Sequence, residues 1–152
     1  MTAANAARTT TPAVVSNTIT TLAEIRNLLA KDAWPSRGLA VRAGIVAANP
    51  KSTGALVRIA DGQPMRAAHL WLRIANYLDD GQQLVAALSV AAQCAYRGGN
   101  YSAACNCISR AEAAAHLHRV ALPLAVDDLK EAIAEARVTP QTSHAGRTDG
   151  TA

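Results

Sequence analysis

The stretch that decides the fold is residues 82–115, which reads QQLVAALSVAAQCAYRGGNYSAACNCISRAEAAA. Apolar residues recur at helical spacing on both sides of Gly98-Gly99, so the stretch predicts two helices, 82–97 and 101–115. The glycine pair predicts a helix stop, because glycine adopts the left-handed conformation at little cost. We therefore predict a helical hairpin, whose structural residues are Gly99, Tyr101, Ala104, Ile108 and Ala111.

Apolar residues at helical spacing predict further helices before and after the hairpin. A capping box, Thr21-Leu22-Ala23-Glu24, predicts the start of the first helix at Thr21, and Trp34-Pro35 predicts its end. Ser, Asn, Asp, Gly and Pro residues that typically start or end helices predict four more helices, at 36–48, 52–60, 64–78 and 123–137. No segment alternates polar and apolar residues over the length of a strand. The expected fold class is all-α, a small antiparallel helical bundle ending in the hairpin.

The chain of 152 residues suits one domain. Residues 1–20 are rich in Thr, Ala and Asn, and residues 138–152 in Thr, Gly, Ser and Pro, with almost no apolar residue in the second segment. Both compositions are typical of disordered tails. The expected organisation is a single helical domain, 21–137, between an N-terminal tail, 1–20, and a C-terminal tail, 138–152.

Three cysteines, Cys94, Cys105 and Cys107, are an odd count that does not build a disulfide framework. The N-terminus has no apolar secretory segment, and no stretch reaches the roughly 18 apolar residues of a membrane span. We therefore expect a cytoplasmic protein that does not enter a membrane.

The charge is unevenly distributed along the chain, whose formal net charge is +4. Residues 22–78 contain eight bases and three acids, whereas residues 79–137 contain five bases and seven acids. A basic surface opposite an acidic one can steer an anionic partner. Two ordinary solvated faces explain the same pattern, so both interpretations stay open.

Cys94, Cys105 and Cys107 with His116 and His118 are the best candidates for metal ligands. Zinc needs four ligands that converge, and Cys105 and Cys107 would point about 200° apart on a helix. The cysteines are therefore interpreted as core or interface residues. No phosphate-binding glycine motif is present. We expect no metal, no cofactor and no catalytic residues, and hence no enzyme.

The hairpin residues Gly99, Tyr101, Ala104, Ile108 and Ala111 resemble the second half of a tetratricopeptide repeat. In such a repeat the glycine makes the turn, the small alanines let the helices touch, and the larger residues fill the groove between them. Leu88, Ala91, Ala92 and Ala95 match the first half less well, and no second copy occurs at a period of about 34 residues.

A wider stretch, residues 65–140, resembles the C-terminal helical region of an actinobacterial family of unknown function. The resemblance is carried by these motifs: Leu70-Trp71-Leu72, Ala86-Ala87-Leu88, Tyr96-Arg97-Gly98-Gly99-Asn100, Ala104, Arg110-Ala111 and Leu124. The family's N-terminal region of strands and helices has no counterpart here. The resemblance implies a helical-hairpin fold and an actinobacterial source, and it implies no activity.

We therefore expect an interaction module that binds another protein or itself. Exposed aromatic and Arg side chains dominate many protein interfaces, which singles out Trp34, Trp71, Arg58, Arg66 and Arg73 as candidates for partner binding. The alternative is a basic DNA-binding or regulatory protein, in which residues Ser36 to Ala60 form a helix-turn-helix with Lys51 and Arg58 near phosphates.

Overall fold

The computed structural model describes residues 12–138. It contains seven α-helices and one short 3-10 turn within that range: α1 (Pro12–Lys31), α2 (Arg37–Ala48), η1 (Pro50–Ser52), α3 (Thr53–Ile59), α4 (Pro64–Ala75), α5 (Gly81–Arg97), α6 (Tyr101–His118) and α7 (Leu124–Val138). No residue between 12 and 138 lies in a strand. The predicted all-α bundle is confirmed.

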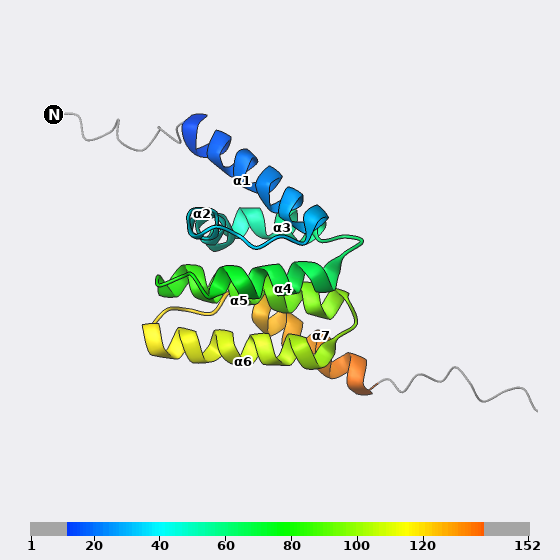
Figure 1. Ribbon diagram of the computed structural model, residues 1–152. Coiled ribbons are helices and arrows are strands. Elements are labelled where there is room, and N and C mark those ends of the chain that lie inside the picture. The colour runs from blue at the N-terminus through cyan, green and yellow to red at the C-terminus, as the bar shows by residue number, and fades with distance from the viewer. Residues whose placement is uncertain (1–11, 139–152) are drawn as a thin grey trace, which may run out of the picture.

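Helix α5 is the centre of the bundle. It contacts α2, α3, α4, α6 and α7, and every residue from Val85 to Ala92 is buried. A helix that is apolar on all sides needs such cover on all sides. Figure 1 shows α1 outermost on one side, α6 on the other, and α4 and α5 between them.

The turns around α5 follow from local chemistry. The Asp80 side chain caps α5 by accepting a hydrogen bond of 3.0 Å from the backbone N–H of Gln83. At the other end Gly99 has a φ of +73°, and Asn100 Oδ1 accepts a bond of 3.0 Å from the N–H of Ala103 to start α6. Tight turns at both ends make α4, α5 and α6 run antiparallel (Figure 1).

Small residues let α5 and α6 approach closely. Ala104 and Ala111 of α6 are fully buried, and Ile108 is 5% exposed. Tyr101 is half-buried, and its ring lies 5.5 Å from that of Tyr96 on α5. Ala104, Ile108 and Ala111, which the sequence singled out, therefore belong to the buried core, and Tyr101 packs against it. The likeness to a tetratricopeptide repeat stays a prediction.

The predicted start of the first helix at Thr21 is wrong, because α1 begins at Pro12. Proline suits the first turn of a helix, where its missing N–H is not needed. Residues 12–20 of the expected N-terminal tail are therefore helical, while residues 1–11 lie outside the described range. At the other end α7 extends to Val138, and residues 139–152 of the expected C-terminal tail also lie outside it.

Thr21 consequently sits inside α1 and caps nothing. It is fully buried, and its hydroxyl has no hydrogen-bond partner among the described residues. It lies four and eight residues before Ile25 and Leu29, which are 1% and 4% exposed. Residues at these spacings share one helix face, so Thr21 continues the buried stripe of α1.

Other predicted boundaries also differ, and α1 ends at Lys31 rather than at Trp34. Ser52 makes no side-chain cap. Instead Asn49 Oδ1 accepts a bond of 3.1 Å from the N–H of Lys51 and starts η1, which leaves α3 only seven residues. Helix α4 ends at Ala75 rather than Leu78, and α6 continues to His118, where Arg119 takes the left-handed conformation with φ of +55°.

Candidate interaction surface

The surface around Trp34 begins with the end of α1. Asp32 has a φ of +50°, a conformation that Asp tolerates better than most residues. The N–H of Asp32 donates to the Leu29 carbonyl at 3.4 Å, and the N–H of Ala33 donates to the Leu28 carbonyl at 3.1 Å. This pair of bonds is the Schellman motif, which fixes the direction of the chain as it leaves the helix.

The chain is fixed equally well on the other side of Trp34. Pro35 is buried. The Ser36 side chain then caps α2, because its Oγ accepts a bond of 3.2 Å from the N–H of Leu39. Trp34 therefore lies in a short connection with both ends anchored, yet 65% of its surface is exposed.

Arg73 of α4 holds the Trp34 ring in place. Its guanidinium carbon lies 4.4 Å from the ring centroid, a cation–π contact. The same guanidinium forms an ion pair with Asp32, at 3.7 Å between Nη1 and Oδ1, and only 25% of the Arg73 side chain is exposed. Asp32 therefore positions the cation that positions the ring.

Arg66 lies two helical turns before Arg73 on α4 and also contacts the end of α1. Its Nη1 donates to the Leu29 carbonyl at 3.2 Å and to Gln63 Oε1 at 2.8 Å. A cation at a helix C-terminus satisfies exposed carbonyls and the negative end of the helix dipole. We call Trp34, Asp32, Arg73 and Arg66 the Trp34 cluster.

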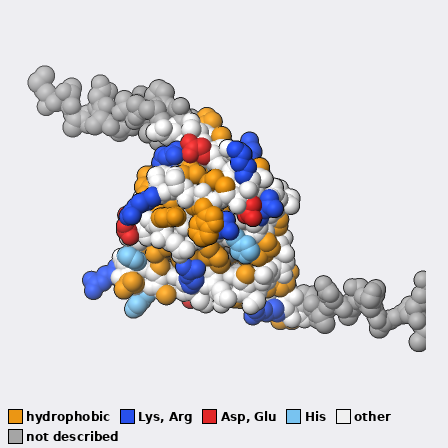
Figure 2. All heavy atoms as spheres, viewed as in Figure 1, with side chains coloured by type: hydrophobic (Ala, Val, Ile, Leu, Met, Phe, Trp, Pro, Cys, Tyr) orange, Lys and Arg blue, Asp and Glu red, His pale blue; other side chains and the backbone are white. Residues whose placement is uncertain are grey.

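The Trp34 cluster presents an apolar ring edged by charge. Figure 2 shows one face of the molecule, on which hydrophobic side chains lie between separate Lys, Arg, Asp and Glu side chains. The cluster itself contains two cations and one carboxylate and no nucleophile or imidazole.

Two of the five residues predicted to bind a partner lie elsewhere. Trp71 is 1% exposed and belongs to the core, so it is not a surface anchor and that prediction is wrong. Its burial follows from the apolar stripe of α4 that it shares with Ala68 and Ala75. Arg58 is exposed on α3, which packs against α2 and α5 rather than α4. The structure therefore brings together Trp34, Arg66 and Arg73 alone of the five.

The sequence missed the role of Asp32. Part of this role could have been predicted. Asp32 follows the apolar helical pattern and precedes Trp34-Pro35, and Asp at such a helix end can adopt the left-handed conformation. The pairing of Asp32 with Arg73 had no such signal. These residues are 41 positions apart, and only tertiary packing brings them together.

The acidic residues of the basic segment, 22–78, all take part in ion pairs. Each of the three acids in that segment has a basic partner: Glu24 with Arg42, Asp32 with Arg73, and Asp61 with Arg97. The Glu24–Arg42 pair is bidentate, at 3.0 and 2.9 Å, and the hydrogen bonds from Arg42 lower the pKa of Glu24. The ion pairs leave the net excess of five bases in this segment unchanged, because the three acids are already subtracted in it.

The cysteines do not gather with the histidines. Cys94 and Cys107 are buried, and burial raises the pKa of the Cys94 thiol to about 12 and raises that of Cys107. Cys105 is half-buried, with Arg137 Nη2 3.5 Å from its Sγ. Between residues 12 and 138, no group of three or more His, Cys, Asp or Glu side chains is placed to hold a metal ion.

The comparisons with known proteins give no family. No family model, curated protein or solved structure matches the chain. The resemblance to the actinobacterial family stays a prediction. Among the helices of residues 12–138, none combines the length and the hydropathy needed to cross a lipid bilayer.

Proposed function

We propose that this protein is a non-catalytic helical interaction module that binds another protein, or a second copy of itself, through the Trp34 cluster. The observation that carries the proposal is a tryptophan that is 65% exposed while its backbone and ring are both held. Tryptophan and arginine are enriched among the residues that dominate binding energy at interfaces. A side chain already fixed in position loses little conformational entropy on binding.

The DNA-binding alternative has weaker support within the segment Ser36 to Ala60. Arg37 pairs with Asp79 and Arg42 with Glu24, which leaves Lys51 and Arg58 as the exposed bases without an ion pair among the described contacts of that segment. Affinity for nucleic acid grows with the number of phosphates neutralised. Two bases beside a seven-residue helix supply little of that affinity.

We further propose a cytoplasmic location. It is supported by the odd cysteine count and by the three thiols, which remain free between residues 12 and 138. Thiols of this kind are typical of proteins in reducing compartments.

Truncation of the anchor tests the interaction proposal. Trp34→Ala should weaken capture of the partner from a lysate of the source cells, or self-association in sedimentation, by about thirtyfold, which corresponds to the ~2 kcal/mol of an interface hot spot. Leu117→Ala is the matched control, because Leu117 is 77% exposed at the far end of α6. Circular dichroism should show that both variants keep the helical content of the unaltered protein.

The salt dependence of binding distinguishes the interaction module from the DNA-binding alternative. Binding through an aromatic anchor should change little between low and physiological salt, whereas phosphate binding weakens steeply. Micromolar binding of duplex DNA at physiological salt, lost when Lys51 and Arg58 are changed to Ala and kept in Trp34→Ala, would replace the interaction module with a nucleic-acid-binding protein.

A further inference from the structure

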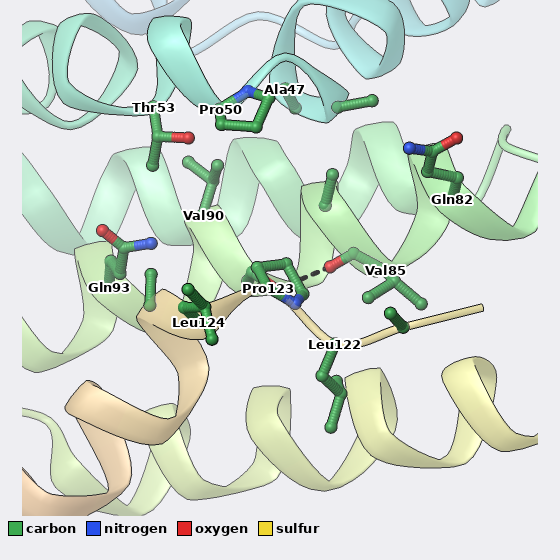
Figure 3. Close-up of a pocket in the computed structure, with 15 residues that line it drawn as sticks. Ala47, Pro50, Thr53, Gln82, Val85, Val90, Gln93, Leu122, Pro123 and Leu124 are labelled. Atoms are coloured by element: carbon green, nitrogen blue, oxygen red, sulfur yellow. Dashed lines mark hydrogen bonds between the residues drawn. The ribbon is translucent and has the colours of Figure 1, made fainter.

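An apolar groove lies at the C-terminal end of α2, whereas the loop that carries Trp34 precedes the N-terminal end of that helix. Its floor is formed by α5, with Val85 and Val90 each 1% exposed. One wall is the end of α2 and the start of η1, at Ala47 and Pro50 (Figure 3). The opposite wall is the connection from α6 to α7, at Leu122 and its neighbours. The cavity has a volume of about 470 Å³.

The lining of this groove is uncharged. None of its 15 residues is Asp, Glu, Lys, Arg or His. The Ser89 hydroxyl is already used, because it donates to the Val85 carbonyl at 2.7 Å (dashed in Figure 3). The long polar side chains are Gln82 and Gln93, and Figure 3 shows them at opposite ends of the groove.

These features set the size and polarity of an occupant. Gln82 and Gln93 are 11 positions apart on one helix, which corresponds to about 16 Å. Small-molecule sites are mostly apolar, have volumes of roughly 300–1,000 Å³ and carry a few polar groups that fix orientation. A charged ligand would lose its hydration here without gaining an opposite charge.

We propose that this groove binds an uncharged, mainly apolar small molecule, elongated along α5, with a hydroxyl, carbonyl or similar group that can reach the amide of Gln82 or Gln93. Burial of the apolar body against Val85, Val90 and Leu122 supplies the affinity. The amides accept or donate one hydrogen bond at an end of the ligand. This inference is independent of the function proposed for the Trp34 cluster.

Other occupants fit less well. A protein partner buries about 800 Å² on each side, and a groove that extends for only three helical turns is too short to supply that area alone. The chain's own segments 1–11 and 139–152 contain no Leu, Ile, Val, Phe, Tyr or Trp. Met1 is the one large apolar side chain in their sequences, too little to fill the groove.

Two related dyes test the charge of the ligand. N-phenyl-naphthylamine is neutral, and anilinonaphthalene sulfonate is the same scaffold with an added sulfonate; both fluoresce more strongly in an apolar site. Titration of the full chain should show saturable binding of the neutral dye at one site per chain, at least tenfold tighter than the sulfonate. Octanol should displace the neutral dye, and octanoate at neutral pH should not.

Isosteric variants locate the site. Gln82→Glu and Gln93→Glu each keep the shape of the groove and each add a negative charge at a different end. The variant that carries both substitutions should therefore bind the neutral dye about tenfold more weakly. Gln83→Glu adds a single negative charge at a neighbouring position, where the side chain does not line the groove, and should bind as the unaltered protein does.

Three results would overturn the proposal: no saturable binding of the neutral dye, equal binding of both dyes, or equal binding by the combined variant and Gln83→Glu. The melting temperature of each variant is measured first, so that a loss of binding by an unfolded chain is recognised. If the combined variant unfolds, Gln93→Glu alone replaces it in the comparison.

Discussion

Two glycines in α2 test how this helix packs, because Gly44 is buried and Gly38 is exposed. A Cβ added at Gly44 would lie 2.9 and 3.0 Å from the two methyl groups of Leu78 and 3.2 Å from Cβ of Gln83. A Cβ added at Gly38 would meet nothing within 4 Å. Replacing glycine by alanine inside a helix stabilises the folded protein by up to about 1 kcal/mol. Any loss of stability in Gly44→Ala must therefore come from crowding.

The magnitudes predict opposite signs for the two substitutions. Overpacking a core costs about 1–3 kcal/mol, which exceeds the helical gain at Gly44, so Gly44→Ala should destabilise the protein by about 1 kcal/mol. Gly38→Ala, in the first turn, should stabilise it by about 0.5 kcal/mol. For a domain of this size, 1 kcal/mol corresponds to about 4 °C in melting temperature.

Thermal unfolding followed by circular dichroism at 222 nm measures both effects with the same probe. We expect Gly44→Ala to melt below the unaltered protein and Gly38→Ala to melt above it. If both variants melt higher, α2 does not pack against Leu78 and the placement of α2 on α4 and α5 is refuted. If both melt lower, the helical conformation at Gly38 is wrong.

Three further predictions concern other parts of the core. Ala104→Leu should overpack the α5–α6 interface and cost about 1–3 kcal/mol in urea unfolding, whereas Ala113→Leu on the exposed face of α6 should change little. Thr21→Val, which replaces a buried hydroxyl that has no partner among the described residues, should stabilise the protein by about 1 kcal/mol; a loss of stability would show that the hydroxyl is hydrogen-bonded. Cys94 should make stability fall as the pH rises above about 9, because its thiol ionises in the unfolded chain while burial holds the folded pKa at about 12. The slope from this group reaches about 1.4 kcal/mol per pH unit, and urea unfolding at pH 8, 9 and 10 should show a shallower slope for Cys94→Ala.

Local chemistry made much of the fold predictable. Ser36, Pro64 and Gly99 each act on the residues directly around them, as a cap, a first-turn proline and a left-handed turn residue. Such effects depend on the backbone within about four positions. The boundaries of α2, the start of α4 and the α5–α6 turn could therefore be predicted from the sequence.

The start of α1 could not be predicted, because local and tertiary effects favour different boundaries there. Thr21 with Glu24 has the form of a capping box, and the β-branched residues before it have a low helix propensity. The helix nevertheless continues upstream to Pro12, and Thr21 is buried in line with Ile25 and Leu29. Packing of an apolar face outweighs propensities of a few tenths of a kcal/mol.

The two tryptophans show which part of the candidate site lay beyond the sequence. Trp71 recurs with Ala68 and Ala75 at helical spacing, so its burial could be derived. Trp34 precedes a proline and lies outside any helical period, so exposure could be derived for it too. What could not be derived is that Arg73, which lies off the apolar stripe of α4, would reach the Trp34 ring. That contact depends on the angle at which α4 crosses the end of α1, and the angle is set by packing of side chains far apart in the chain. An exposed tryptophan is visible in a sequence, whereas the contacts that hold it in position require the tertiary structure.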